Sequence, residues 1–421
     1  MIFRIPDALQ SGGVVGNPLR ILHLTTSFPS GPDDAAGPFV LRLFEAQEKL
    51  GIQCRVLTPA STSPSTWPDA YKVYRFRYAP WSCQRLAQQS GGIPAALAGQ
   101  PWLYGLLPAF LAGMGLSLIR LARQHDIIHA HWSACGAIAV LTQSMHRRPV
   151  ITTLRGSDVH RAKKSGAFSL LHRKAIQDSN FTVGVSQTMA AELRRQHPGL
   201  TDKIRFVSDG VDDAFYALPA DRHRLFLSPF KLLFIGSLIP LKGLDVLLKA
   251  LARIKAQSAW TLTVAGDGPG KGYLRSLATD LGIAPGIRFL GSVPPARIPK
   301  LMRDHYLFIL PSYREGRPSV VLEAMAAALP VLATDVDGTR ELVQHGKIGW
   351  LVPPGDVDAL SGALDDLIGG KRNLAAAGLA GRQWMLEQGL TWDNTAKRYR
   401  QLYMDAIGSS KGTIGDAKYG Q

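Results

Sequence analysis

The sequence is poor in cysteine and begins without an apolar leader. It holds three cysteines, Cys54, Cys83 and Cys135, in 421 residues, and none forms a Cys-x-x-Cys pair. An odd number of scattered cysteines supports neither a disulfide framework nor a zinc site, so we expect a reducing compartment. Residues 1–16 contain no sustained apolar run and do not look like a secretory signal. These absences favour a cytoplasmic location.

The chain has fewer acidic than basic residues. The chain carries 48 lysines and arginines against 32 aspartates and glutamates, for a formal net charge of +16. This excess favours an anionic partner, a membrane surface, or simple solubility. Nucleic-acid binders interleave aromatic and basic residues, yet the basic clusters at 161–164, 173–174 and 194–195 contain no aromatic residue. We therefore expect no nucleic-acid partner, and peripheral contact with an anionic membrane at its inner face.

Residues 86–119 form the longest stretch without a charged side chain. Three prolines, at 94, 101 and 108, interrupt it, and eleven residues separate Pro108 from Arg120. A membrane-spanning helix needs about 20 apolar residues. The stretch therefore favours a buried core helix first, an apolar patch facing a membrane or an acceptor second, and a membrane span last.

Short apolar runs alternate with helical patterns along most of the chain. This alternation predicts an α/β fold of two Rossmann-like, doubly wound domains whose parallel sheets face a central cleft. We assign residues 1–215 to the first domain, 216–230 to a polar linker and 231–391 to the second domain, with a disordered tail at 409–421. The predicted strands cover residues 19–25, 54–57, 127–129, 150–154, 181–185 and 204–207, then 231–236, 262–265, 287–290, 307–310 and 331–333.

The most informative run is Glu-Gly-Arg-Pro-Ser-Val-Val-Leu-Glu at 315–323. Pro318 suits the first turn of a helix over residues 319–328, so Glu315 lies at the helix mouth, where free N–H groups can bind phosphate. Eight helical residues span about 12 Å, whereas hydrolytic carboxylate pairs lie roughly 5–9.5 Å apart. The spacing favours two ends of one elongated ligand, with Glu315 on a sugar and Glu323 on a ribose diol. The alternative, a surface helix with two acids, is disfavoured because Glu323 stands in an apolar run.

Several motifs together resemble the retaining glycosyltransferases of family 4, the glycosyl transferases group 1, which have the two-domain GT-B fold. The resemblance covers about residues 19–407. It implies a nucleotide-sugar in the second domain, with Glu315 contacting the transferred sugar and Glu323 the ribose, and a final helix at about 392–407 that crosses back to the first domain. The matching segments are residues 234–243, 264–269, 289–292, 310–323 and 349–356.

Lys242 is the second predicted catalytic residue. It follows a strand and a turn, so its ammonium can face the donor diphosphate, although an exposed lysine at a helix start is the alternative. Many family members carry an arginine that contacts the diphosphate where this chain has Ser237. Here either Lys242 binds the diphosphate together with another basic residue such as Arg317, or backbone N–H donors are enough to neutralise it. Gly266 opens a glycine-rich turn near the nucleotide that fails the P-loop spacing. The predicted donor site comprises Glu323, Gly236, Ser237, Gly266, Arg317, Pro318 and Ser319.

The acceptor site is expected on the first domain. Gly37, in the loop 27–39, is matched to the family's glycine loop, where a close ligand leaves no room for a side chain. His131 lies nearest the cleft in the run Asp-Ile-Ile-His-Ala-His-Trp, and His129 points to the same side. No third ligand is spaced to complete a metal site with this pair, and a packing or hydrogen-bonding role is as good an interpretation.

Arg155 stands where the family often has a histidine. If that histidine serves the acceptor, this chain needs another group, either Asp158 or the leaving phosphate. Arg155 can bind an anionic acceptor such as a lipid-linked phosphate, or form a structural salt bridge with Asp158.

The expected activity is transfer of a hexosyl unit from a UDP- or GDP-sugar to a glycan or lipid-linked acceptor, in cell-envelope or exopolysaccharide biosynthesis. The anomeric configuration is retained, and no metal or other cofactor is expected. Two alternatives remain: a non-catalytic scaffold of the same fold that binds a membrane or polyanion, and a sugar-nucleotide epimerase.

Overall fold

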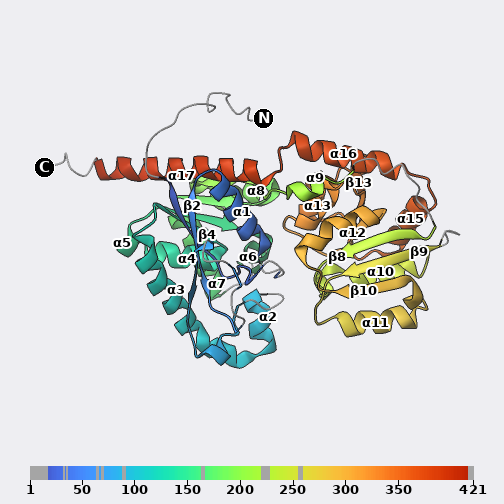
Figure 1. Cartoon of the computed structure of the whole chain (residues 1–421), viewed down its shortest axis with the longest axis horizontal. Coiled ribbons are helices and arrows are strands. Elements are labelled where there is room, and N and C mark those ends of the chain that lie inside the picture. The colour runs from blue at the N-terminus through green and yellow to red at the C-terminus, as the bar shows by residue number, and fades with distance from the viewer. Residues whose placement is uncertain are drawn as a thin grey trace.

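The chain folds into two α/β domains that lie side by side (Figure 1). The computed structural model describes residues 18–31, 34, 37–62, 66–67, 71–87, 92–162, 166–219, 228–254 and 259–415. Each domain is built on one sheet, and all strand pairings within the two sheets are parallel. The predicted pair of Rossmann-like domains is confirmed.

The first sheet has seven strands in the order β3-β2-β1-β4-β5-β6-β7. Central strands of a parallel sheet are covered on both faces, and β4 and β5 are buried throughout, including two histidines of β4 and two threonines of β5. The strands are β1 (Arg20–Leu24), β2 (Gln53–Pro59), β3 (Val73–Phe76), β4 (Ile127–His131), β5 (Val150–Leu154), β6 (Phe181–Gly184) and β7 (Ile204–Phe206). The α-helices are α1 (Pro38–Lys49), α2 (Gly92–Gly99), α3 (Leu107–Ala122), α4 (Ser133–Leu141), α5 (Gln143–His146), α6 (Gly156–Ala162), α7 (Ala167–Asp178) and α8 (Gln187–Gln196), with 3₁₀ turns η2 (Trp81–Cys83), η3 (Pro101–Leu106) and η4 (Pro198–Lys203).

The second sheet has six strands in the order β10-β9-β8-β11-β12-β13. They are β8 (Phe230–Ile235), β9 (Trp260–Ala265), β10 (Ile287–Gly291), β11 (Leu307–Leu310), β12 (Val331–Thr334) and β13 (Gly349–Val352). The α-helices are α9 (Asp213–Tyr216), α10 (Leu244–Leu251), α11 (Lys271–Asp280), α12 (Ile298–Asp304), α13 (Ser319–Ala326), α14 (Asp337–Arg340), α15 (Val357–Ile368) and α16 (Leu374–Glu387), with η5 (Pro240–Lys242), η6 (Ala284–Gly286) and η7 (Pro295–Arg297).

The last helix, α17 (Trp392–Gly415), leaves the second domain and runs along the first, where it packs on α1 (Figure 1). Tyr399 and Tyr403 are 2% and 0% exposed and lie in the core of the first domain. Their hydroxyls bond to Thr153 at 2.9 Å and to His129 at 2.7 Å. The first domain is therefore made of two separate parts of the chain.

The structure differs from the sequence-based prediction at three places in the fold. Strands β3 and β13 were not predicted. Val211 and Phe215, assigned to the first domain, pack in the core of the second. Residues 409–415 of the predicted tail belong to α17, and residues 416–421 lie outside the described part of the chain.

The uncharged stretch forms α2, η3 and α3, so its prolines begin helical segments. Pro101 starts η3, and Pro108 lies in the first turn of α3. Within Pro101–Ala122, the most apolar 18-residue window has a mean hydropathy of 1.7, but only 28% of that window is buried. The favoured prediction of a core helix holds for one side of α3, which packs into the core of the first domain, and the other side is exposed.

Candidate active site

Glu315 and Lys242 meet at the carboxyl end of the second sheet. Glu315 lies in the loop between β11 and α13, and Lys242 ends η5. The Lys242 Nζ donates to Glu315 Oε1 at 2.6 Å, and the Ser312 hydroxyl donates to the same oxygen at 2.7 Å. The two charged side chains are 22% and 9% exposed, which strengthens their attraction. The two predicted catalytic residues thus form one unit, and Ser312, from the same loop, is a member that the sequence did not single out.

Glu323 lies one turn into α13, closer to its start than the two turns expected from the sequence. It is half-buried, and no hydrogen bond or ion pair reaches its carboxylate from the described residues. The pKa of Glu323 is raised to about 8, mainly by burial; the charge of Asp212 contributes to this rise, and the charge of Arg42 opposes it. A buried acceptor without donors is costly, and a pair of ligand hydroxyls would satisfy it.

Most of the other predicted donor residues follow β8 and β9 or stand at the start of α13. Gly266 has φ 146°, and a Cβ there would lie 1.9 Å from the carbonyl oxygen of Gly236, so a contact between the two strand ends already requires this glycine. Ser237 follows Gly236 and is half-buried. Pro318 precedes α13 as its N-cap, which leaves the N–H groups of Ser319 and the next residue unbonded within the described chain.

The Arg317 guanidinium is already engaged by other residues of the chain. It is 4% exposed, donates to Glu341 at 2.6 Å and lies 5.8 Å from the ring of Phe206 in the first domain. Glu341 also accepts from the backbone N–H groups of Gln187 and Thr188, at 3.0 and 3.1 Å, at the start of α8. A carboxylate is favourable at this helix end. Arg317 therefore helps to join the two domains.

We expect Glu341→Ala to loosen this junction. The change removes the acceptor at the start of α8 and leaves the Arg317 guanidinium buried without its partner, which costs roughly 3 kcal/mol. The melting temperature should fall by several degrees, and the radius of gyration from small-angle scattering should increase. Asp335→Ala is the control, because it breaks the neighbouring but exposed pair with Arg340. Equal scattering and melting for Glu341→Ala and the parent would contradict this role.

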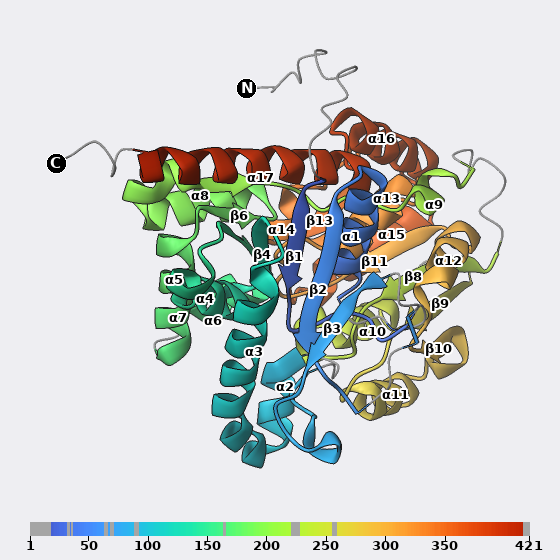
Figure 2. The ribbon, with the colours of Figure 1, turned by 60° about the vertical axis from the view of Figure 1, so that its left-hand side comes forward.

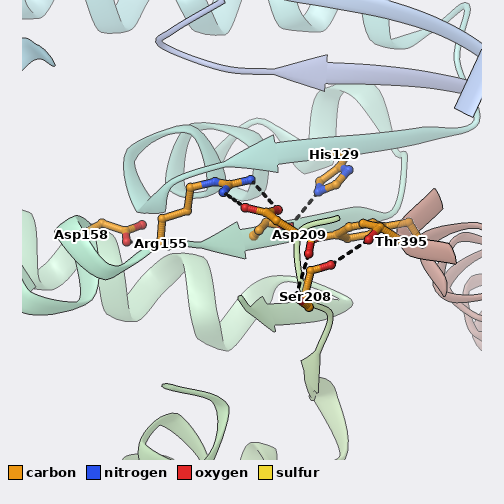
Figure 3. A network of polar contacts seen from close by, with 8 residues as sticks. His129, Arg155, Asp158, Ser208, Asp209 and Thr395 are labelled. Atoms are coloured by element: carbon orange, nitrogen blue, oxygen red, sulfur yellow. Dashed lines mark hydrogen bonds and ion pairs between the residues drawn. The ribbon is translucent and has the colours of Figure 1, made fainter. Parts of the chain in front are cut away.

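Arg155 pairs with Asp209, and not with Asp158 as the structural alternative predicted. Its guanidinium donates to the two Asp209 oxygens at 2.6 and 3.3 Å (Figure 3). It also stacks 3.4 Å from the ring centroid of Phe39. Both members of the pair are largely buried. Asp209, which follows β7, was missed because nothing in the local sequence links it to Arg155, 54 residues earlier.

Asp158 is a structural acceptor. It is 4% exposed and accepts from Ser133 N and Oγ, Arg155 N and Val159 N, all between 2.8 and 3.0 Å. Burial raises the pKa of Asp158 to about 6, and these hydrogen bonds oppose the rise. Four donors already surround the carboxylate, so the geometry does not support the predicted acceptor-binding role.

The structure of the first domain itself requires a glycine at position 37. Gly37 is the N-cap of α1 with φ 62°, and a Cβ there would lie 2.5 Å from the carbonyl oxygen of Ser27.

The backbones of the two domains come into close contact at Gly156 and Gly316. A Cβ on Gly156 would lie 2.6 Å from the Gly316 Cα. These residues follow Arg155 and Glu315, so the carboxyl ends of the two sheets face each other here.

His131 is buried within a cluster of three histidines. His23 of β1 joins His129 and His131, and the nearest ring nitrogens of the three all lie within 4.8 Å of one another. The prediction that no third ligand is spaced to join the pair was wrong, because His23 comes from a strand 108 residues away from His131. His131 is fully buried, with Nε2 3.1 Å from His23 Nδ1, and its Nδ1 has no hydrogen-bond partner among the described residues. The placement does not expose His131 to an acceptor.

The cluster already has partners for most of its nitrogens. His23 Nε2 lies 2.8 Å from Gln47, and His129 bonds Tyr403 and Thr153 at 2.7 and 2.8 Å. Burial holds the pKa of each histidine below its usual value, and for His129 and His131 the charge of Arg155 also lowers it. Neutral imidazoles near a cation suit a hydrogen-bonded core.

Comparisons with known proteins agree with this architecture. The family described as glycosyl transferase 4-like domain matches residues 35–210, and the family described as glycosyl transferases group 1 matches residues 220–384. The D-inositol 3-phosphate glycosyltransferase of Jonesia denitrificans is 30% identical over 423 residues, covering 91% of this chain and 94% of the relative. The GDP-mannose-dependent α-(1-6)-phosphatidylinositol monomannoside mannosyltransferase of Mycolicibacterium smegmatis is 28% identical over 300 residues, covering 67% of this chain and 78% of the relative.

Among solved structures, Anabaena HepE in complex with UDP-glucose superposes with a TM-score of 0.71 at 21% identity, covering 93% of this chain and all of HepE. At this identity the likeness shows the fold. The sequence matches reach across both domains. The chain therefore belongs to the glycosyltransferases of the GT-B fold, with a glycosyl transferase 4-like domain followed by a glycosyl transferases group 1 domain.

Proposed function

We propose that this chain is a retaining, family 4 hexosyltransferase that uses a UDP- or GDP-sugar and acts on a glycan or lipid-linked acceptor in cell-envelope or exopolysaccharide biosynthesis. The observation that carries the proposal is the half-buried Glu323 carboxyl. It has no hydrogen-bond or ion-pair partner among the described residues and lies one turn into α13, behind the Lys242–Glu315 pair. One elongated donor fits both ends. The HepE structure contains UDP-glucose, and the Mycolicibacterium smegmatis relative is GDP-mannose-dependent. These two proteins support UDP and GDP, respectively, as the nucleotide of the proposed donor.

In this mechanism the donor diphosphate accepts from Lys242 and from the open N–H groups at the start of α13. These donors stabilise the negative charge that builds up as the glycosidic bond breaks. Glu315, held by Lys242 and Ser312, accepts from hydroxyls of the transferred sugar.

The acceptor enters from the first domain and attacks the same face of the sugar that the diphosphate leaves. Asp158 is saturated with donors, so the acceptor proton passes to an oxygen of the departing diphosphate. Arg155 is neutralised by Asp209 and shapes the acceptor side together with Phe39.

The test is calorimetric titration with UDP and GDP in the presence of EDTA, followed by proton NMR of the transfer product. We expect saturable binding of one nucleotide without metal, and a product with the anomeric configuration of the donor. An inverted product would overturn retention. Failure of both nucleotides to bind would favour the scaffold alternative, and conversion of the sugar-nucleotide without acceptor would favour an epimerase.

A further inference from the structure

One end of the first domain carries an exposed apolar surface. The segment α2, η3 and α3 lies at the end of that domain away from α17 (Figures 1 and 2). Large apolar side chains stand out there: Trp102, Tyr104 and Leu116 are 53%, 58% and 60% exposed, and Trp81, in the preceding η2, is 50% exposed. Large apolar residues gathered on one segment mark a surface that meets another apolar phase.

Helix α3 has two different faces. Phe110, Met114 and Leu118 are buried in the core of the first domain, and Leu103 of η3 joins them. On the other face, positions 105, 109, 112 and 116 follow helical spacing and are all exposed and apolar or glycine. The segment is long and apolar enough to cross a membrane by composition. Because one face is fixed to the sheet, it lies along a surface instead.

The charge around this face has one sign. Between Ala70 and Asp126 the sequence contains no aspartate or glutamate, and six basic residues: Lys72, Arg75, Arg77, Arg85, Arg120 and Arg123. All except Arg75 are exposed. Arg77 lies 5.9 Å from the ring of Trp81, and Arg120 ends the exposed face of α3. Tryptophan, tyrosine and arginine around an apolar face are typical of residues at the headgroup level of a bilayer.

We propose that this face, which we call the α3 face (Trp81, Trp102, Tyr104 and Leu116 with Arg77, Arg120 and Arg123), docks on an anionic lipid bilayer. The exposed rings and Leu116 enter the interfacial layer, and the arginines contact the acidic headgroups. A second copy of the chain is a poorer occupant, because two α3 faces would bring arginines together, and the segment between Ala70 and Asp126 supplies no carboxylate to pair with them. The proposal stands on this surface alone and does not require the donor chemistry.

The test is flotation of the full-length protein with vesicles of phosphatidylcholine, with and without phosphatidylglycerol. We expect binding to the anionic vesicles that weakens with salt, and little binding to the neutral ones. Trp102→Ser, Tyr104→Ser and Leu116→Gln combined should lower the partition coefficient at least tenfold. Each of Arg77→Gln and Arg120→Gln should lower it about fivefold.

Leu170→Gln combined with Tyr273→Ser is the matched control, because these side chains are 68% and 60% exposed on α7 and α11. It should bind vesicles like the parent. Nucleotide titration of every variant separates this proposal from the donor site, and should be unchanged. Equal binding of parent and triple variant, or no binding to anionic vesicles, would overturn the proposal. A dimer in sedimentation that the triple variant dissolves would assign the face to a second copy instead.

Discussion

Glu315→Gln and Lys242→Ala are each expected to lower the transfer rate about 10²- to 10³-fold. Lys242 is the only cation hydrogen-bonded to Glu315 among the described residues, and the pair stands at the start of α13, where the diphosphate and sugar meet. Removing the ammonium leaves the leaving group with backbone donors only. Removing the carboxylate charge frees the sugar and leaves Lys242 without its counter-ion. Turnover is measured as nucleotide released from the donor, with and without acceptor.

The two variants should differ in how they fail. Glu315→Gln keeps an oxygen that Ser312 can donate to, so the loss should appear mainly in kcat. Lys242→Ala removes a contact made in both the ground state and the transition state, so KM should rise as well. Lys249→Ala, which breaks an exposed pair with Asp245 on α10, is the control and should keep the parent rate. Full activity in both Glu315→Gln and Lys242→Ala would disprove the assigned roles.

Glu323→Ala should weaken binding of the nucleotide by about 10- to 100-fold, because hydrogen bonds to a charged group contribute roughly 1.5–3 kcal/mol. The parent should also release a proton on binding. Its carboxyl is protonated below pH 8 in the free protein, since burial raises the pKa to about 8, and ligand hydroxyls favour the ionised form. Affinity should therefore rise with pH up to about 8. Calorimetry in buffers of different ionisation enthalpy measures the proton directly.

The same carboxyl makes stability depend on pH in a defined direction. Between its ordinary pKa of 4.5 and the raised value of about 8, the folded chain keeps a proton that the unfolded chain loses. The contribution of Glu323 to the free energy of unfolding therefore falls as pH rises through this window. Glu323→Gln should melt higher than the parent, most clearly above pH 8. Glu387→Gln, at an exposed site on α16, is the control. If the melting temperatures of the parent and of Glu323→Gln changed with pH in the same way, the raised pKa of Glu323 would be contradicted.

The strands with continuous apolar runs were readily predicted from the sequence. The predicted ends of β5 and β11 match the structure at both residues, because these strands are buried on both faces. Strand β3 was missed since it is a short edge strand, Val-Tyr-Arg-Phe, with exposed and half-buried positions. Strand β13 was missed because four residues beginning with glycine form a strand only once β12 is beside them.

For the candidate site, local sequence patterns suggested individual residues but could not show which other residues they contact. The run around Glu315 includes the start of α13, so the position of Glu315 before a helix could be predicted. The pairing of Arg155 with Asp209 spans 54 residues, and Glu341 reaches α8 across about 150 positions of sequence. Such contacts depend on how the two domains meet. Arg317 and Asp158 were therefore assigned to ligands, when other parts of the chain already occupy them.

Helix α17 also affects the order in which the two domains complete their folding. Its Tyr399 and Tyr403 complete the core around β4 and β5, yet they lie near the end of the chain. The whole second domain emerges from the ribosome before they do. Gln47, His129 and Thr153 must wait for their partners from α17, with the strand surfaces around them uncovered. Although domains usually fold in the order of their synthesis, here the second domain can close first and the first domain closes last.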